Sequence, residues 1–93
     1  MINLTQKNWA EIDAELAKRV VRLRKRKKIS QQELASRSGV SFGSVKRFEQ
    51  SGEISLQSLT KIAIALQAED ELENLFSAVP FASIEEVLNE QKH

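Results

Sequence analysis

The side chains best suited to chemistry in this chain are cations, and they gather in one stretch of the sequence. Residues 18–47 contain eleven Lys or Arg and a single acid, Glu33, which gives this stretch a net charge of +10. Residues 48–93 carry −7 and residues 1–17 carry −2. A basic block beside acidic blocks indicates an anionic partner bound on one side only. For residues 24–28 alone the alternative is a solvated helix end, since cations are favoured at a helix C-terminus.

The groups that enzymes use are nearly absent from the sequence. His93 is the only histidine, there is no cysteine, and the three glycines are too scattered to form a phosphate-binding loop. Histidine is the usual general base, and paired His or Cys side chains are the usual metal ligands. We therefore predict no catalytic residue, no metal site and no cofactor, and we do not expect an enzyme.

Length and hydropathy bound the class of protein. Ninety-three residues can bury one modest core, which predicts a single domain. No apolar run approaches the roughly 20 residues that a membrane helix needs. The first residues lack the apolar stretch of a signal peptide. We expect a cytoplasmic protein that does not associate with membranes.

The pattern of polar and apolar residues is helical nearly throughout, so the predicted fold class is all-α with five to six helices. The first helix should end near Arg26, and its apolar face consists of Trp9, Ile12, Leu16, Val20 and Leu23. Ser30-Gln31-Gln32-Glu33 has the form of a capping box, in which the Ser hydroxyl and the Glu carboxylate satisfy backbone amides reciprocally. The second helix begins there and ends at Gly39, because glycine takes the left-handed conformation without steric cost.

The third helix is predicted from a cap at Ser41 to Ser51-Gly52, with Val45 and Phe48 on its inner side. Ser55 caps a fourth helix, whose predicted buried residues are Leu56, Leu59, Ile62, Ala63 and Leu66.

The remaining sequence predicts one or two more helices. A fifth runs from about Asp70 to Val79, with its apolar residues at Leu72, Leu75, Phe76 and Val79. Acids at its start suit the helix dipole, and Pro80 ends it. A second capping box at Ser83-Ile84-Glu85-Glu86 opens a short sixth helix.

Two short helices on either side of Gly39-Val40 have the spacing of a helix-turn-helix, which we place at residues 31–50. At 100° per residue, the side of the third helix opposite Val45 and Phe48 is shared by Phe42, Gly43, Lys46 and Arg47, with Ser44 on the flank. A helix that enters the major groove would present these residues to base edges.

Each of these residues has a predicted role. Arg47 is suited to a bidentate contact with guanine, and Lys46 to a base or a phosphate. Phe42 either covers a thymine methyl group or packs under a neighbouring helix, and the sequence leaves both open. Gln31 and Ser41 stand at helix N-termini, where they and the backbone amides suit phosphate.

These residues resemble the Cro/CI-type, or XRE-type, helix-turn-helix family, which has the λ-repressor-like DNA-binding fold. The resemblance covers about residues 18–76, and its pattern of Ser-Gln-x-Glu-Leu-Ala followed by Gly-Val-Ser lies within residues 30–41. It implies that Gln31 contacts phosphate and that the outward residues of the third helix read bases. It also implies a pair between Arg24 and Glu49, which is structural first and orients toward phosphate second.

Two positions depart from the family pattern. Ser38 stands where an apolar residue is usual, and Gly43 removes a side chain where the family often has one that reads bases. Specificity would then depend more on Arg47 and on the shape of the DNA. With Lys28 from the basic run, the predicted phosphate contacts are Gln31, Ser41, Arg24 and Lys28.

The predicted organisation is one helix-turn-helix domain over residues 1–79, with an extended first helix, and a short C-terminal extension over residues 80–93. The resemblance implies a homodimer on double-stranded DNA with an inverted-repeat operator, and a role as a transcriptional regulator, most simply a repressor. The alternative is an antitoxin of HipB type, which neutralises a toxin partner and represses its own operon. The fifth helix and the segment from Pro80 to Leu88 are candidates for self-association or partner binding, unless they cap the same core.

Overall fold

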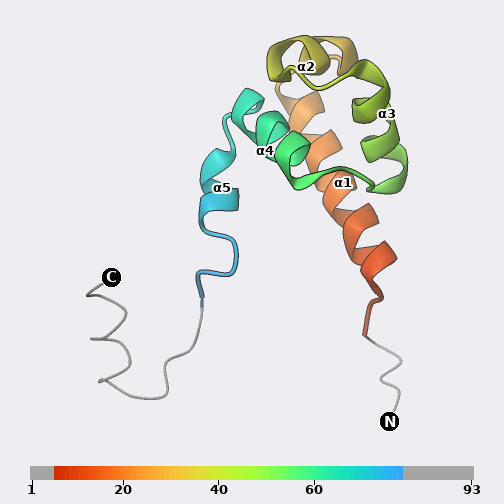
Figure 1. Ribbon diagram of the computed structural model, residues 1–93, viewed down its shortest axis with the longest axis vertical. Coiled ribbons are helices and arrows are strands. Elements are labelled where there is room, and N and C mark those ends of the chain that lie inside the picture. Colours follow the sequence, from red (N-terminus) through yellow and green to blue (C-terminus); the bar gives the residue numbers. More distant parts are fainter. Residues whose placement is uncertain (1–5, 79–93) are drawn as a thin grey trace, which may run out of the picture.

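The computed structural model describes residues 6–78, which form five helices and no strand (Figure 1). The helices are α1 (Trp9–Arg26), α2 (Gln31–Ser38), α3 (Phe42–Ser51), α4 (Leu56–Ala65) and α5 (Glu69–Glu73). This confirms the predicted all-α class. The predicted sixth helix and the extension at residues 80–93 lie outside the described residues. None of the described helices combines the length and apolar character needed to cross a membrane.

Side-chain caps begin four of the five helices. The side chains of Asn8, Ser30, Ser41 and Ser55 each accept the backbone N–H three residues later. The three serine caps confirm the sequence prediction, whereas Asn8 was not predicted. The second half of the capping box at Ser30 is different: the Glu33 carboxylate accepts from Arg37 Nη2 at 3.2 Å, four residues along α2. This exposed pair takes the place of the expected contact to the Ser30 amide.

The core forms where α1, α2, α3 and α4 meet. In Figure 1, α2 lies beyond the C-terminal end of α1, α3 lies beside α1, and α4 runs beneath α2 and leads into α5. The buried apolar cluster draws on each of these four helices and on the turns between them; it consists of Ala17, Ile29, Leu34, Val40, Val45, Phe48, Ile62 and Leu66. α3 is therefore held from behind by α1 and from the side by α2, which fixes the direction of its outer face.

Leu56, which we predicted to be buried, is exposed, and so are two residues of the predicted apolar face of the first helix. Trp9 and Ile12 are 76% and 52% exposed, and Leu56 is 71% exposed. The first turns of α1 extend beyond the other helices (Figure 1), so the apolar face continues where no neighbouring helix covers it. Leu56 is the first residue of α4, at the end of that helix rather than along its packed side. Periodicity identifies an apolar face, but it does not show how far a neighbour extends along it.

The fifth helix is shorter than predicted. It ends at Glu73 rather than near Val79, and Phe76 takes a left-handed backbone conformation with φ of +61°. Side chains compete for the backbone there: Asn74 Nδ2 donates to the Asp70 carbonyl at 2.8 Å, and Ser77 Oγ donates to the Asn74 carbonyl at 2.6 Å. Such local bonds favour turns over continued helix. Val79 lies outside the described residues.

Gly52 ends α3 at a point of close approach to α1. Its φ is +82°, and a Cβ atom placed on it would lie 2.8 Å from the backbone carbonyl carbon of Asp13. Gly39, which ends α2 with φ of +76°, has nothing within 4 Å of the same position. Both glycines satisfy the left-handed cap, but only Gly52 also allows two helices to touch.

We predict that Gly52→Ala destabilises the fold more than Gly39→Ala does. Gly39→Ala should cost about 1–2 kcal/mol for the left-handed conformation alone, while Gly52→Ala adds a clash with backbone that cannot rotate away. Urea denaturation would measure the free energy of unfolding of both variants. Gly43→Ala is the control, because Gly43 is helical and has open space around it, so it should gain roughly 0.5–1 kcal/mol. Equal losses for the two caps would contradict the contact at Asp13.

Candidate nucleic-acid interface

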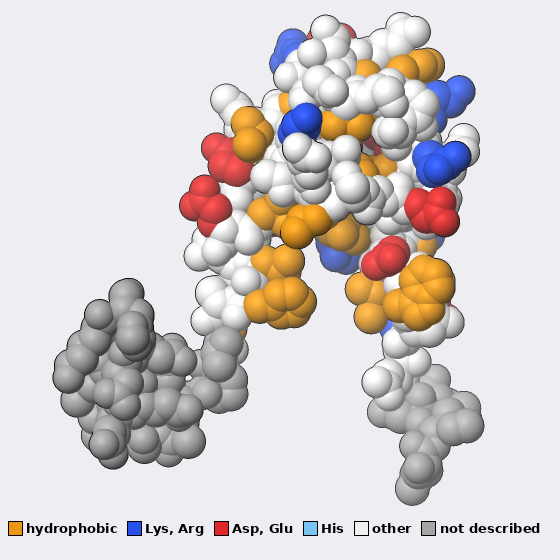
Figure 2. Space-filling view, in the orientation of Figure 1, with side chains coloured by type: hydrophobic (Ala, Val, Ile, Leu, Met, Phe, Trp, Pro, Cys, Tyr) orange, Lys and Arg blue, Asp and Glu red, His pale blue; other side chains and the backbone are white. Residues whose placement is uncertain are grey.

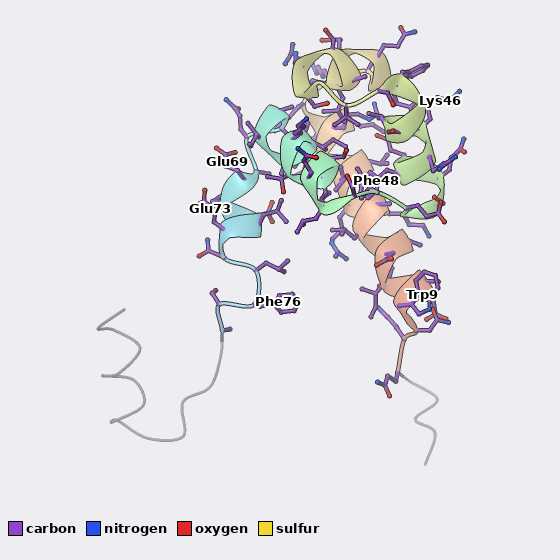
Figure 3. All side chains as sticks on the ribbon, in the orientation of Figure 1. Trp9, Lys46, Phe48, Glu69, Glu73 and Phe76 are labelled. Carbon is purple, nitrogen blue, oxygen red and sulfur yellow. The ribbon has the colours of Figure 1, made fainter. Side chains whose placement is uncertain are left out.

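The outer face of α3 collects the residues that we predicted to read bases. Val45 and Phe48 are buried, at 0% and 1% exposure. The residues on the opposite side are all exposed, and we call them the reading face: Phe42, Gly43, Ser44, Lys46 and Arg47. Figure 3 shows Lys46 on the outer side of α3 and Phe48 on its inner side. The sequence therefore predicted correctly which side of α3 is free.

Phe42 and Lys46 contact each other on this face. The Lys46 Nζ atom lies 5.2 Å from the centroid of the Phe42 ring, within cation–π range. The two residues are four apart on the helix, so their side chains meet one turn above each other. Phe42 is 39% exposed, so its ring is not fully buried under a neighbouring helix. The contact holds an apolar surface and a cation side by side at the start of α3.

Ser41 and Ser44 form a second contact at the same end of α3. Ser41 Oγ accepts the Ser44 backbone N–H at 3.1 Å and donates to Ser44 Oγ at 2.8 Å. Both residues are exposed. The hydroxyl of Ser41, which we predicted to contact phosphate, thus serves the helix cap first. Gly43 stands between these residues with open space around its α-carbon, so it leaves the backbone accessible.

A buried ion pair joins α1 to α3 behind the reading face. Arg24 Nε and Nη2 donate to the two carboxylate oxygens of Glu49 at 2.7 and 2.9 Å, and Arg24 Nη1 donates to the Ile29 carbonyl at 2.8 Å. The side chains are only 10% and 6% exposed. The pair that the family resemblance implied is present in bidentate form. We expected Arg24 among the phosphate contacts, but the structure places its guanidinium inside, on protein acceptors.

Gln31 joins this pair, which the sequence did not indicate. Its Nε2 donates to Glu49 Oε1 at 2.8 Å, so Glu49 accepts from α1 and α2 at once. Gln31 and Glu49 are eighteen residues apart and share no periodicity, so only the folded arrangement of α2 and α3 brings them together. Gln31 is partly buried, and the contact fixes the direction of its amide at the start of α2.

Arg47 and Lys28 lie at different places on the surface. Arg47 lines a shallow groove of about 340 Å³ beside α3, together with Ser44, Glu53, Ile54, Ser55 and Ser58. Ser44 is three residues before Arg47 on the same helix, as the helical wheel predicted. The sequence did not place Ser55 and Ser58 beside Arg47, because they come from the loop and from α4. Lys28 is exposed in the turn between α1 and α2, with φ of +59°. Lys28 therefore belongs to a different element from the reading face, which is on α3.

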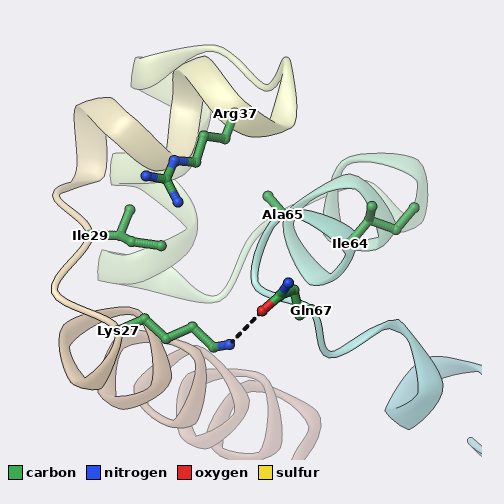
Figure 4. A pocket seen from close by; sticks show the side chains of 6 residues that line it. All are labelled: Lys27, Ile29, Arg37, Ile64, Ala65 and Gln67. Carbon is green, nitrogen blue, oxygen red and sulfur yellow. Dashed lines mark hydrogen bonds between the residues drawn. The ribbon is translucent and has the colours of Figure 1, made fainter.

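A second groove opens away from α3, and no residue of the reading face lines it (Figure 4). Its volume is about 460 Å³, and it is lined by Lys27, Ile29, Arg37, Ile64, Ala65 and Gln67. Lys27 Nζ and Gln67 Oε1 approach to 3.5 Å across it. Within residues 6–78 no cluster of acidic or histidine side chains is placed to hold a metal ion.

The Arg24–Glu49 pair yields a stability prediction. Glu49→Ala should lower the free energy of unfolding by about 3–5 kcal/mol, because it leaves a buried guanidinium without its counter-ion. Glu33→Ala is the control, since it removes the acid of an exposed ion pair with Arg37 and should cost less than about 1 kcal/mol. Urea denaturation of the two variants provides the comparison. A small loss for Glu49→Ala would show that the pair is not a principal stabiliser of the bundle.

Comparison with known proteins agrees with this geometry. Residues 20–72 match the family model described as helix-turn-helix. Among curated proteins and among solved structures, no match to the chain was found. The matched residues cover more than half of the chain and include the end of α1, all of α2, α3 and α4, and most of α5. Members of the matched family are generally not enzymes. The chain therefore belongs to the XRE-type, or Cro/CI-like, helix-turn-helix family of DNA-binding transcription regulators.

Proposed function

We propose that this regulator is a repressor that binds an inverted-repeat operator as a homodimer, with α3 of each copy in the major groove. The observation that carries the proposal is the division of α3 into a buried side and a reading face. Lys46 and Arg47 stand directly opposite Val45 and Phe48, so the packing that holds the helix also aims its cations outward. A helix of this kind fits the major groove and presents its side chains to base edges.

Arg47 is the residue best suited to read a base. A guanidinium donates two parallel hydrogen bonds to the O6 and N7 atoms of guanine, which no other base pair accepts in the same way. Arg47 is exposed, and the groove beside it is lined by serine hydroxyls. Lys46 then serves a neighbouring base or phosphate, and Phe42 serves a thymine methyl group. Gly43 allows the backbone of α3 to come close to the bases.

Phosphate contacts would set the position of α3 in the groove. Gln31 and Ser41 stand at the starts of α2 and α3, where free backbone amides favour an anion. Lys28 adds a cation in the preceding turn. Arg24 would act indirectly: it holds Glu49, and Glu49 holds the amide of Gln31. In this proposal Arg24 positions a phosphate contact rather than making one.

Twofold pairing would supply the affinity that one copy lacks. A single reading face spans only a few base pairs, and two of them on half-sites one helical turn apart combine their contacts. Inhibition of transcription would follow if the operator overlaps a promoter.

The second candidate function is that of an antitoxin that also represses its operon. It is favoured by the exposed acids of α5, which are Glu69, Asp70, Glu71 and Glu73, because such a surface suits a basic protein partner. Purification of the chain with the product of the adjacent gene would test it: a stable complex supports the antitoxin function, and a homodimer alone supports the repressor.

We predict that Arg47→Ala weakens specific operator binding by about 1–3 kcal/mol and relaxes the base preference at one position of each half-site. Fluorescence anisotropy with a set of single-substitution operators would measure both effects. Lys61→Ala is the matched control, because Lys61 is exposed on α4 and its loss changes the net charge equally. An unchanged base preference in Arg47→Ala would contradict the placement of α3 in the major groove.

A different outcome is expected for Gln31→Ala. Since a phosphate contact carries no base information, this variant should weaken operator and scrambled DNA by similar factors. Binding to both duplexes is compared across a salt series, with Gln6→Ala as the control at an exposed glutamine ahead of α1. A loss confined to the operator would mean that Gln31 reads a base instead.

A further inference from the structure

Two ends of the described chain project from the bundle and expose large apolar side chains. Trp9 and Ile12 in the first turn of α1 are 76% and 52% exposed, and Leu75 and Phe76 after α5 are 55% and 86% exposed. Figure 2 shows hydrophobic side chains on both projecting ends, and Figure 3 labels Trp9 on the α1 end and Phe76 on the α5 end. Contiguous exposed apolar side chains of this size mark an interaction surface. None of them belongs to the reading face, so the surface stays available while α3 binds DNA.

The α1 end carries an apolar stripe that leads into cations. Trp9, Ile12 and Leu16 recur at steps of three and four and share one side of the helix. Arg19 follows Ile12 by seven residues, which places it on the same side two turns later. Ala17 and Arg24 mark the buried side of α1, which lies about a quarter turn from this stripe at 100° per residue. Val20 and Leu23 continue the same side but are partly buried against the core. The exposed order along α1 is therefore apolar first, at Trp9 and Ile12, and basic second, at Arg19.

The α5 end has the opposite order. Its acids come first, at Glu69, Asp70, Glu71 and Glu73, and its exposed apolar residues Leu75 and Phe76 come last. Laid antiparallel, the two ends would place Phe76 against Trp9 and the acids of α5 beside Arg19. The match is one of apolar character and of charge.

We propose that this surface binds a second copy of the chain, with the α1 stripe of each copy against the α5 end of the other. Because both complementary halves are on one chain, a twofold arrangement makes the contact twice and closes. The four aromatic rings of such a pair would bury on the order of 600 Å², and the aliphatic residues add to this toward the roughly 1,000 Å² that a specific interface needs. The proposal rests on the proposed function only for its use on an operator, because the pairing itself needs no DNA.

Charge favours this reciprocal contact of α1 with α5, which we call the exchange, over a contact between the α5 ends of two copies. The four acids of α5 would face four identical acids across an α5–α5 contact, and like charges brought together oppose association. The exchange instead sets the acids against Arg19 and its neighbours Lys18 and Arg22. It also covers Trp9 and Ile12, which an α5–α5 contact would leave exposed.

Trp9 reports on this contact directly, since it is the single tryptophan of the chain. The test follows its emission maximum and its quenching by iodide in the DNA-free full chain, from nanomolar to high micromolar concentration, with the mass measured by sedimentation. We expect a dimer whose formation coincides with a blue shift and with protection of Trp9 from iodide. A monomer with exposed Trp9 at all concentrations would overturn the proposal. A monomer with shielded Trp9 would also overturn it, since residues of the same chain would then cover the surface.

Variants separate this interface from any other dimer contact. Phe76→Ser should weaken dimerisation about tenfold or more and return Trp9 to water, while Ile64→Ser is the control, because Ile64 is 56% exposed beside the second groove. Arg19→Glu and Glu69→Arg should each weaken the dimer, and the double variant should restore it. A dimer that survives Phe76→Ser and Arg19→Glu with Trp9 still shielded would refute the exchange.

The outcome is independent of DNA binding. If the proposed function failed, the wild-type chain would not select an operator, yet its dimer and its Trp9 signal would be unaffected. If the exchange failed, operator selection by α3 would persist without the response of Trp9 to concentration.

Discussion

The bidentate contact between Arg24 and Glu49 is the interaction on which the placement of the reading face depends. Apolar packing is strong but non-directional, so the core alone tolerates small rotations of α3 about its axis. The guanidinium and the carboxylate meet through two hydrogen bonds of 2.7 and 2.9 Å, a bidentate contact that is directional, and they join the end of α1 to α3. Gln31 and the Ile29 carbonyl complete the network. Both helices of the motif and the turn before them are therefore hydrogen-bonded to the same buried charge pair.

Short elements explain why such a constraint matters. α2 and α3 have eight and ten residues, and helices of that length are marginal by themselves in water. Their caps at Ser30 and Ser41 are local, but their mutual angle is set by what they pack against. On the outer side, the contacts of Ser41 with Ser44 and of Lys46 with Phe42 hold side chains in place before any ligand arrives. Side chains that are already ordered in the free protein lose less conformational entropy on binding.

The parts of the structure that depend on neighbours in the sequence were predictable, and the parts that depend on distant residues were less so. The serine caps, the glycines that end α2 and α3, and the buried side of α3 at Val45 and Phe48 follow from local rules of hydrogen bonding and periodicity. The exposure of Trp9 and Leu56 does not, because an amphipathic pattern has no information on how far the covering helix extends. The early end of α5 reflects competition from the side chains of Asn74 and Ser77, whose strength the sequence pattern does not rank.

The candidate site shows the same division. The reading face was predictable from a helical wheel, and the Arg24–Glu49 pair from the family pattern. The contact of Gln31 with Glu49 and the position of Ser55 and Ser58 beside Arg47 required the folded chain, since they bring together residues from separate elements. The burial of the Arg24 guanidinium likewise became visible only once the acceptors around it were in place.

The open space at Gly43 has a consequence for how related regulators can acquire different operator preferences. Nothing within 4 Å would obstruct a side chain added at this position, and nearly any residue is a better helix former than glycine. If α3 enters the major groove as proposed, a substitution at Gly43 in a duplicated copy of the gene would add a base-contacting group in one step without destabilising the fold. The operator of that copy would then differ from the ancestral one at the base pair that the added side chain contacts. Under the proposed function, Gly43 is thus a position of α3 at which a single substitution would let two related regulators bind different operators.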